Sequence, residues 1–157
     1  KNEDNKVNLK DILYPSLVKT NVESKNWKEA VCESGKLLLK KEIVTEEYIE
    51  NMIKNIDKRG PYVVITPGVA LVHADPDQGV KKIGISLITL KEPVNFHHSQ
   101  NDPVEIVVAF ASPDKDSHVK ALTTLVDKLY DQKYRKKIIS YGEPKEIVNL
   151  LKNHEEV

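Results

Sequence analysis

The stretch Pro67–Gly79, PGVALVHADPDQG, changes character in its middle. Four apolar residues, Val69 to Val72, run directly into His73, and turn-forming residues follow. A short continuous apolar run bounded by turn formers is typical of a strand that is covered on both faces. Because side chains alternate along a strand, Val69, Leu71 and His73 are expected to share one face. The pattern therefore predicts an imidazole at the lip of a buried strand.

Three further segments in the middle of the chain have strand character. With the segment 68–74 they give four predicted strands; the other three are YVVIT (62–66), IGISLITL (83–90) and VEIVVAFA (104–111). The last of these is, like 68–74, an almost unbroken apolar run, which indicates a sheet with both faces covered. The turn formers DPDQG and NDP lie in the loops between strands.

Helical periodicity precedes and follows these strands. One helix is expected over 26–41, and a second from Thr45, a candidate N-cap, to Gly60-Pro61. Three more are expected, one from Asp116 or Ser117, and then 134–140 and 144–152. This order predicts an α/β fold with a central mixed β-sheet flanked by helices on both faces.

The composition indicates one soluble globular domain. The chain has 157 residues, 39% apolar and 31% charged, and 24 basic residues balance 24 acidic ones. Zero formal charge argues against general nucleic-acid affinity. No apolar run is long enough to span a membrane, and a single cysteine fits a reducing cytoplasm. We expect a single domain over 1–157, with residues 1–7 disordered or outside the natural domain, and a longer parent chain stays possible.

Two of the five histidines lie where secondary-structure elements end or begin. His73 ends a predicted strand, and His118 follows SPDKDS, where a strand gives way to a helix. If Asp116 or Ser117 caps that helix, its free N–H groups beside His118 form an anion site. Imidazole can act as a nucleophile or, when charged, as an anion partner. On composition and spacing alone, the default is that both are ordinary strand-end and helix-start residues.

The remaining histidines and the cysteine give weaker signals. His97 and His98 lie between EPVNF and SQNDP, in an expected surface loop, and His154 lies in the charged C-terminal tail. Adjacent loop histidines are weak evidence for a metal site, and the HxxxH and HExxH spacings are absent. Cys32 falls on the apolar helix 26–41, where a buried, inert thiol is expected.

Two longer segments resemble one protein family. GPYVVITPGVALVHADPDQGVKKIGISLITLKEPVNF (60–96) and NDPVEIVVAFASPDKDSHVKALTTL (101–125) are similar to enzyme IIA domains of the sugar phosphotransferase system (PTS) of the mannitol–fructose type, especially the L-ascorbate and galactitol branch. The resemblance extends from about Asn8 to Leu151. In that family PGxAxPHA marks the phosphorylated histidine, and a second active-site histidine opens a helix after an (S/A)PD-type turn. These positions correspond to His73 and His118.

The resemblance implies a mannitol-type enzyme IIA fold and a cytoplasmic phosphoryl relay for L-ascorbate or a related sugar. The phosphocarrier HPr would phosphorylate His73 at Nε2, and a cysteine of a cognate enzyme IIB would then receive the group. The membrane enzyme IIC would be an indirect partner. His118 and the helix start beside it would stabilise the phosphoryl oxygens. No metal, organic cofactor or nucleic acid is implied.

Two positions depart from the family pattern. Val72 stands where proline usually precedes the histidine. Mannitol-type members also place an arginine near the site, and Arg59, the nearest one upstream here, does not align cleanly. The relay interpretation further predicts an apolar, charge-rimmed surface around His73, built from Ala70, Val72, Ala74 and the loop 75–79.

Two other functions remain open at this point. The same kind of domain could be the regulatory module of a transcription regulator or antiterminator that His73 phosphorylation controls. A small-molecule-binding domain that never carries phosphate is the third interpretation. A longer parent chain with segments that bind DNA or RNA would favour the regulator, and indifference to the loss of His73 would favour the third.

Overall fold

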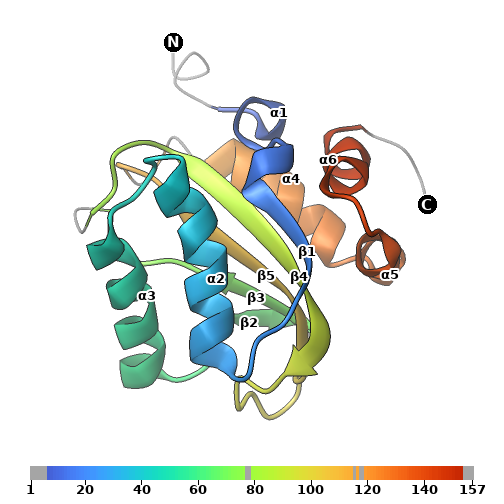
Figure 1. Ribbon diagram of the computed structural model, residues 1–157, viewed down its shortest axis with the longest axis horizontal. Coiled ribbons are helices and arrows are strands. Elements are labelled where there is room, and N and C mark those ends of the chain that lie inside the picture. The colour runs from blue at the N-terminus through green and yellow to red at the C-terminus, as the bar shows by residue number, and fades with distance from the viewer. Residues whose placement is uncertain (1–6, 77–78, 115, 117–118, 154–157) are drawn as a thin grey trace.

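A central sheet of five strands carries helices on both faces, so the predicted α/β fold with a mixed sheet is confirmed (Figure 1). The computed structural model describes residues 7–76, 79–114, 116 and 119–153. The strand order is β1-β4-β5-β3-β2. Two pairs, β1–β4 and β3–β5, are parallel, whereas β4–β5 and β2–β3 are antiparallel. The strands are β1 (Val18–Val22), β2 (Val64–Thr66), β3 (Val69–Val72), β4 (Gly84–Val94) and β5 (Val104–Ala111).

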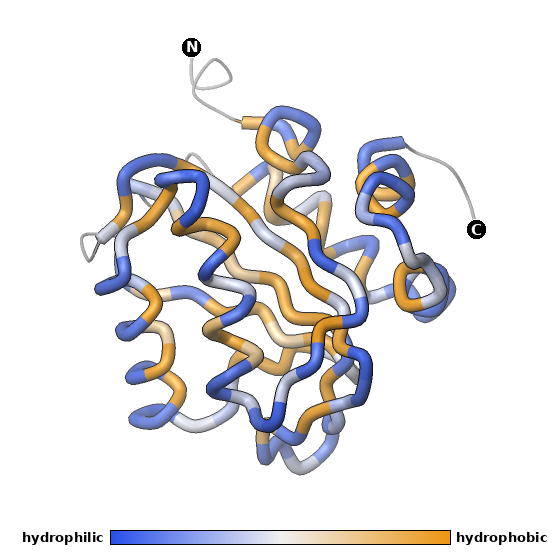
Figure 2. The backbone as a smooth tube through the Cα atoms, in the orientation of Figure 1, coloured by the Kyte–Doolittle hydropathy of each residue, from blue (hydrophilic) through white to orange (hydrophobic). Residues whose placement is uncertain are grey.

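The helices form two layers, one on each face of the sheet (Figure 1). They are α1 (Leu9–Ile12), the short 3₁₀ helix η2 (Pro15–Leu17), α2 (Trp27–Lys40), α3 (Glu46–Arg59), α4 (Val119–Leu129), α5 (Gln132–Ser140) and α6 (Pro144–Lys152). One buried cluster joins the sheet to α2 and α3, and a second joins it to α1, α4, α5 and α6. In Figure 2 the hydrophobic side of these helices is turned towards the sheet. No helix of the described residues is long and apolar enough to cross a membrane.

The strands β3 and β5 are buried on both faces, as their unbroken apolar runs predict. In β3, Ala70 and Val72 pack into the α2–α3 cluster, whereas Val69 and Leu71 pack into the opposite one. Strand β5 alternates in the same way from Ile106 to Ala111. The face that Val69 and Leu71 share with the position of His73 is therefore the face covered by α4.

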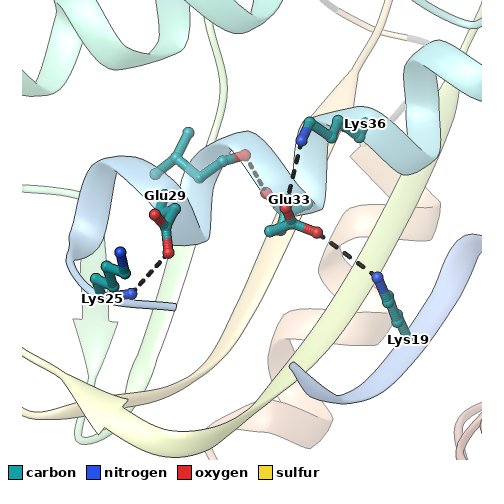
Figure 3. A network of polar contacts seen from close by, with 7 residues as sticks. Lys19, Lys25, Glu29, Glu33 and Lys36 are labelled. Carbon is teal, nitrogen blue, oxygen red and sulfur yellow. Dashed lines mark hydrogen bonds and ion pairs between the residues drawn. The ribbon is translucent and has the colours of Figure 1, made fainter. Parts of the chain in front are cut away.

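Strand β1 was not predicted, and its composition explains why. Only Val18 and Val22, four residues apart, are fully buried, and three polar residues separate them. It is an edge strand whose pairing with β4 is irregular, and Asn21 within it has a φ of 54°. Figure 3 shows Glu33 of α2 between Lys36 and Lys19 of β1, at 3.4 and 3.6 Å. Exposed ion pairs of this kind contribute little stability, so the two valines and the pairing with β4 hold the strand.

Several boundaries differ from the sequence prediction. Strand β3 ends at Val72, two residues earlier than expected, so His73 lies just beyond it. Strand β4 continues four residues past the predicted end at Leu90, because after a register shift Val94 pairs with Val104 of β5. Helix α3 begins after Thr45 as predicted, but the Thr45 side chain makes no capping hydrogen bond to the helix. Helix α4 is described from Val119 onward, and Ser117 and His118 lie outside the described residues, so its predicted start at Asp116 or Ser117 stays a prediction.

Lys128 of α4 is a buried lysine that closes the C-terminal end of α6. Its side chain is 9% exposed, and Nζ donates to the carbonyl oxygens of Leu151 and Asn153 at 2.9 and 2.7 Å. These carbonyls have no partner within the helix, and a cation there also interacts favourably with the helix dipole. Burial lowers the pKa of the Lys128 ammonium. The contact therefore ties the last helix to the α4 layer.

We expect Lys128→Met to lower the free energy of unfolding by about 1.5–3 kcal/mol, because it removes a charged donor and leaves two carbonyls unsatisfied. Urea denaturation followed by circular dichroism measures this. Lys120→Met, an exposed lysine on the same helix, is the matched control and should change stability by less than about 0.5 kcal/mol. Equal stability of the two variants would contradict the capping role.

Candidate functional site

Parallel pairing of β3 and β5 brings their carboxyl ends to the same edge of the sheet. The register aligns Val72, the last residue of β3, with Ala109 of β5. His73 follows β3 directly, and Ser112 follows β5. The segment that leads into α4 therefore leaves the sheet at the edge where His73 lies. His118 falls outside the described residues, so its place beside His73 stays a prediction.

The His73 ring is half-buried and packs between two aromatic side chains. It stacks on Phe110 of β5, with ring centroids 4.9 Å apart and planes 25° from parallel. Tyr62 contacts it edge-on at 6.1 Å and 88°. The ring nitrogen Nδ1 is buried. A group that approaches from solvent therefore cannot reach Nδ1, which makes Nε2 the candidate nucleophile.

Helix α3 holds the backbone on which His73 is mounted. The hydroxyl of Tyr48 donates to the Phe110 carbonyl at 2.6 Å and accepts from the Ala74 N–H at 3.0 Å. The Ala74 carbonyl lies at 3.4 Å from the same hydroxyl, and Asn55 Nδ2 donates to the His73 carbonyl at 3.4 Å. The hydroxyl has one proton, and the shorter distance assigns that proton to the Phe110 carbonyl. Tyr48 thus joins the end of β3 to the end of β5.

The same helix start also anchors the loop after His73 where the loop returns. The Thr45 N–H donates to the Gly79 carbonyl at 2.8 Å, and Val44 and Val80 form an isolated antiparallel bridge. Gly79 has a φ of +92°, and a Cβ there would collide with the Thr45 hydroxyl. A glycine is therefore required at this position. Helix α3 holds the chain at both ends of the segment 74–79.

The turn after β5 is built by its own polar side chains. The Ser112 hydroxyl is buried and donates to the Asp114 carbonyl at 2.6 Å. The Asp116 N–H donates to Oδ1 of Asp114 at 2.9 Å, and the Val119 N–H donates to the Asp116 carbonyl at 3.2 Å. Short polar side chains that bond to nearby backbone groups are typical of such turns. The predicted SPD turn is thus present between β5 and α4.

A family comparison identifies the chain. The model of the family described as "Phosphoenolpyruvate-dependent sugar phosphotransferase system, EIIA 2" matches residues 11–154. The chain belongs to this family. Enzyme IIA components are phosphotransferases with a phosphohistidine intermediate, so the protein is a phosphoryl-relay component of a sugar PTS.

Curated and solved relatives agree with this assignment. The ascorbate-specific PTS system EIIA component of Escherichia coli K12 is 33% identical over 135 residues, which cover 85% of this chain and 88% of that protein. The solution structure of the mannitol-specific cryptic phosphotransferase enzyme IIA of E. coli superimposes with a TM-score of 0.82 at 28% identity, covering 92% of this chain and 98% of that one. The mannitol enzyme IIA of E. coli, solved in complex with phosphorylated enzyme IIB, has a TM-score of 0.79 at 20% identity and covers 89% and 96%. The mannitol-type fold is confirmed, and the regulatory alternative is not favoured.

The surface of this enzyme IIA near His73 differs from the prediction. Ala70 and Val72 are completely buried and Ala74 is 9% exposed, because all three pack into the α2–α3 cluster. They cannot contribute the expected apolar surface, so that part of the prediction was wrong. Tyr62, 41% exposed and in contact with the His73 ring, supplies apolar surface there instead. Asp75, which follows Ala74 in the chain, is exposed and contributes a charge close to His73 in sequence.

The sequence did not predict the aromatic residues around His73 as part of the site. Tyr62 and Phe110 fall in predicted strands, and Tyr48 falls in the predicted second helix. A signal for Tyr48 existed, because it precedes Met52 and Ile56 at intervals of four on the buried stripe of α3. A tyrosine on such a stripe requires a buried partner for its hydroxyl.

The loop histidines have a structural role. The backbone N–H groups of Phe96, His97 and His98 donate to the Asp102 carboxylate. Nδ1 of His98 accepts from the N–H groups of Gln100 and Asn101, at 3.2 and 3.0 Å. The surface-loop prediction is confirmed. Within the described part of the chain, no group of three His, Cys, Asp or Glu side chains could hold a metal ion.

Three other residues were named from the sequence, and the structure describes two of them. Arg59 is the exposed last residue of α3, so its membership of the site stays a hypothesis. Cys32 is half-buried rather than buried, because it lies at the margin of the α2–α3 cluster. His154 lies outside the described residues.

The buried Tyr48 gives the site a measurable pH dependence. Burial raises the pKa of its hydroxyl to about 12. Between pH 10 and 12 the unfolded chain has released this proton while the folded protein retains it, so stability falls by up to about 1.4 kcal/mol per pH unit. Tyr48→Phe lacks this group and should be less stable than wild type by about 1–3 kcal/mol at pH 8. We expect the difference to shrink as the pH rises above 10.

Urea denaturation of both proteins at pH 8, 10 and 11 tests this. The titration of the lysines is common to the two and cancels in the comparison. A difference that stays constant up to pH 11 would show that the Tyr48 hydroxyl is not held in its neutral form by the fold.

Proposed function

We propose that His73 is the residue that carries the phosphoryl group in this enzyme IIA, with HPr as donor and a cysteine of a cognate enzyme IIB as acceptor. The observation that carries the proposal is the geometry of the ring. His73 lies at the sheet edge, half-buried, with Nδ1 turned inward. A relay nucleophile must be open to two partners in turn, and a half-buried ring at a sheet edge, with one nitrogen turned inward, fits that requirement.

Each transfer moves one phosphoryl group between two nucleophiles. In the first, the lone pair of Nε2 forms an N–P bond while the bond from phosphorus to the donor atom of HPr breaks, and its electron pair stays on HPr. In the second, a cysteine thiolate of enzyme IIB forms an S–P bond, and the N–P electron pair returns to Nε2. For the first step Nε2 must be unprotonated, so Nδ1 holds the ring proton.

The charge on the transferring group needs donors around it. His118 and the start of α4 are proposed for this role on the strength of the sequence motif. The parallel pairing of β3 and β5 supports the proposal, because it directs the segment before α4 to the edge occupied by His73. Arg59 lies three residues before Tyr62, which touches the ring, and is a secondary candidate.

The relatives support the sugar and the partner. The ascorbate-specific EIIA component suggests L-ascorbate or a related sugar as the transported substrate. The complex of mannitol enzyme IIA with phosphorylated enzyme IIB supports a cognate enzyme IIB as acceptor. HPr as donor, the indirect membrane partner enzyme IIC and a cytoplasmic location follow from the family role.

Phosphorylation with phosphoenolpyruvate, enzyme I and HPr tests the proposal. We expect wild type to gain one acid-labile phosphate, measured by intact mass, and His73→Ala to gain none. His118→Ala should still accept phosphate but more slowly, by roughly 10²-fold if it supplies one donor to the transition state. His98→Ala, a loop histidine away from the sheet edge, is the control and should behave as wild type.

The outcomes separate the claims. Phosphate on His73→Ala would assign the nucleophile to another residue. No phosphate on wild type, with enzyme I and HPr shown to be active on another enzyme IIA, would refute the relay for this chain. An unchanged rate in His118→Ala would remove His118 from the site while leaving His73 in place.

A further inference from the structure

The hydroxyl of Tyr48 bonds to both strand ends at the site. It accepts from the N–H of Ala74, the residue after His73, and donates to the carbonyl of Phe110. Tyr48 is 1% exposed, so it cannot itself meet HPr, enzyme IIB or a phosphoryl group. Whatever it does for the reaction, it does through the two residues that it holds.

Those two residues control the position of the His73 ring. Phe110 lies against the face of the ring, 4.9 Å between centroids, and Ala74 continues its backbone. Strand β3 ends at Val72, so Ala74 lies beyond its regular pairing, whereas Phe110 still pairs with Ile85 of β4. The Tyr48 hydroxyl therefore links the two strand ends through two hydrogen bonds.

We propose that Tyr48 is a positioning residue of the phosphoryl relay, which holds Phe110 against His73 so that Nδ1 stays buried and Nε2 faces the partner. This proposal rests on His73 being the phosphorylated residue. The geometry explains why a rigid support is useful here. Catalysis of phosphoryl transfer depends on positioning and on electrostatic stabilisation, and a misplacement near 1 Å costs up to about 10²-fold in rate.

The expected kinetic signature is a change in turnover without a change in binding. Tyr48 is buried, so Tyr48→Phe leaves the surface that meets HPr intact and should leave KM for phospho-HPr unchanged. The rate constant kcat should fall between about 10- and 100-fold. Tyr130→Phe is the matched control, because Tyr130 is 54% exposed, follows the C-terminal end of α4 and should keep wild-type kinetics.

A purely structural role for Tyr48 would not alter the state of the His73 ring. Long-range ¹H–¹⁵N spectra of the unphosphorylated protein report which ring nitrogen carries the proton. We expect wild type to show one neutral tautomer with the proton on Nδ1, and Tyr48→Phe to show a mixture. Phosphorus NMR of the phosphorylated proteins should place the phosphate on Nε2 in wild type, with some Nδ1 product in the variant.

A double-mutant cycle tests whether Tyr48 acts through Phe110. Phe110→Leu removes the stacked ring but keeps the carbonyl that Tyr48 bonds to, and should lower kcat by a similar factor. If both residues act through the same contact, the double variant should be no slower than the slower single variant. Multiplying defects would overturn the proposal, as would an unchanged kcat and tautomer in a folded Tyr48→Phe.

The remaining outcomes are also decisive. If Tyr48→Phe does not fold, Phe110→Leu carries the test, and an unchanged kcat in it overturns the proposal. If wild type accepts no phosphate, or if His73→Ala accepts it, the proposed relay through His73 is refuted. The positioning role of Tyr48, which rests on that relay, is then refuted with it. A rise in KM with kcat unchanged would assign Tyr48 to partner binding and likewise overturn the positioning role.

Discussion

The parallel pairing of β3 with β5 is the constraint on which the site depends. It makes two strands that are separated in sequence by β4 end at the same edge, so that His73 and the turn before α4 leave the sheet together. Both strands are covered on both faces. A shift of their pairing by one residue would move each side chain from one buried cluster to the other. The register that stabilises the domain is therefore the register that places the histidine.

A strand end inside a layered fold leaves backbone groups without ladder partners, and each needs one. Around His73 these partners come from α3. Tyr48, Asn55 and the backbone of Thr45 satisfy groups at Ala74, His73 and Gly79 in turn. Helix α3 packs against one face of the sheet, but it supports the His73 ring on the other face, where the ring stacks on Phe110. Stability and site geometry share the same hydrogen bonds.

The sequence predicted strands well where nearly all of their side chains are buried, and poorly where buried and exposed side chains are mixed. The runs 69–72 and 104–111 are mostly apolar and predicted strands correctly. Strand β1 has only two buried valines, with three polar residues between them, and this pattern is not typical of a strand. An imidazole after an apolar run draws attention to His73, but only the family resemblance gives it a function. Tyr48 has no such signal, because a tyrosine on a helical stripe resembles any other core residue until its hydroxyl partners are known. Those partners come from residues 26 and 62 positions away, which no local pattern encodes.

Val72, which stands where the family pattern has proline, has a physical consequence for the site. Val72 is completely buried and pairs with Ala109 as the last residue of β3. A proline at this position would have no N–H for a ladder hydrogen bond and would favour an earlier end of the strand. Valine lets regular pairing reach the residue directly before His73, and the backbone is then held again, by Tyr48, at the residue directly after it. With support on both sides, the ring can remain half-exposed at the edge without the freedom that exposure usually brings, which is the compromise that the relay role proposed for His73 requires.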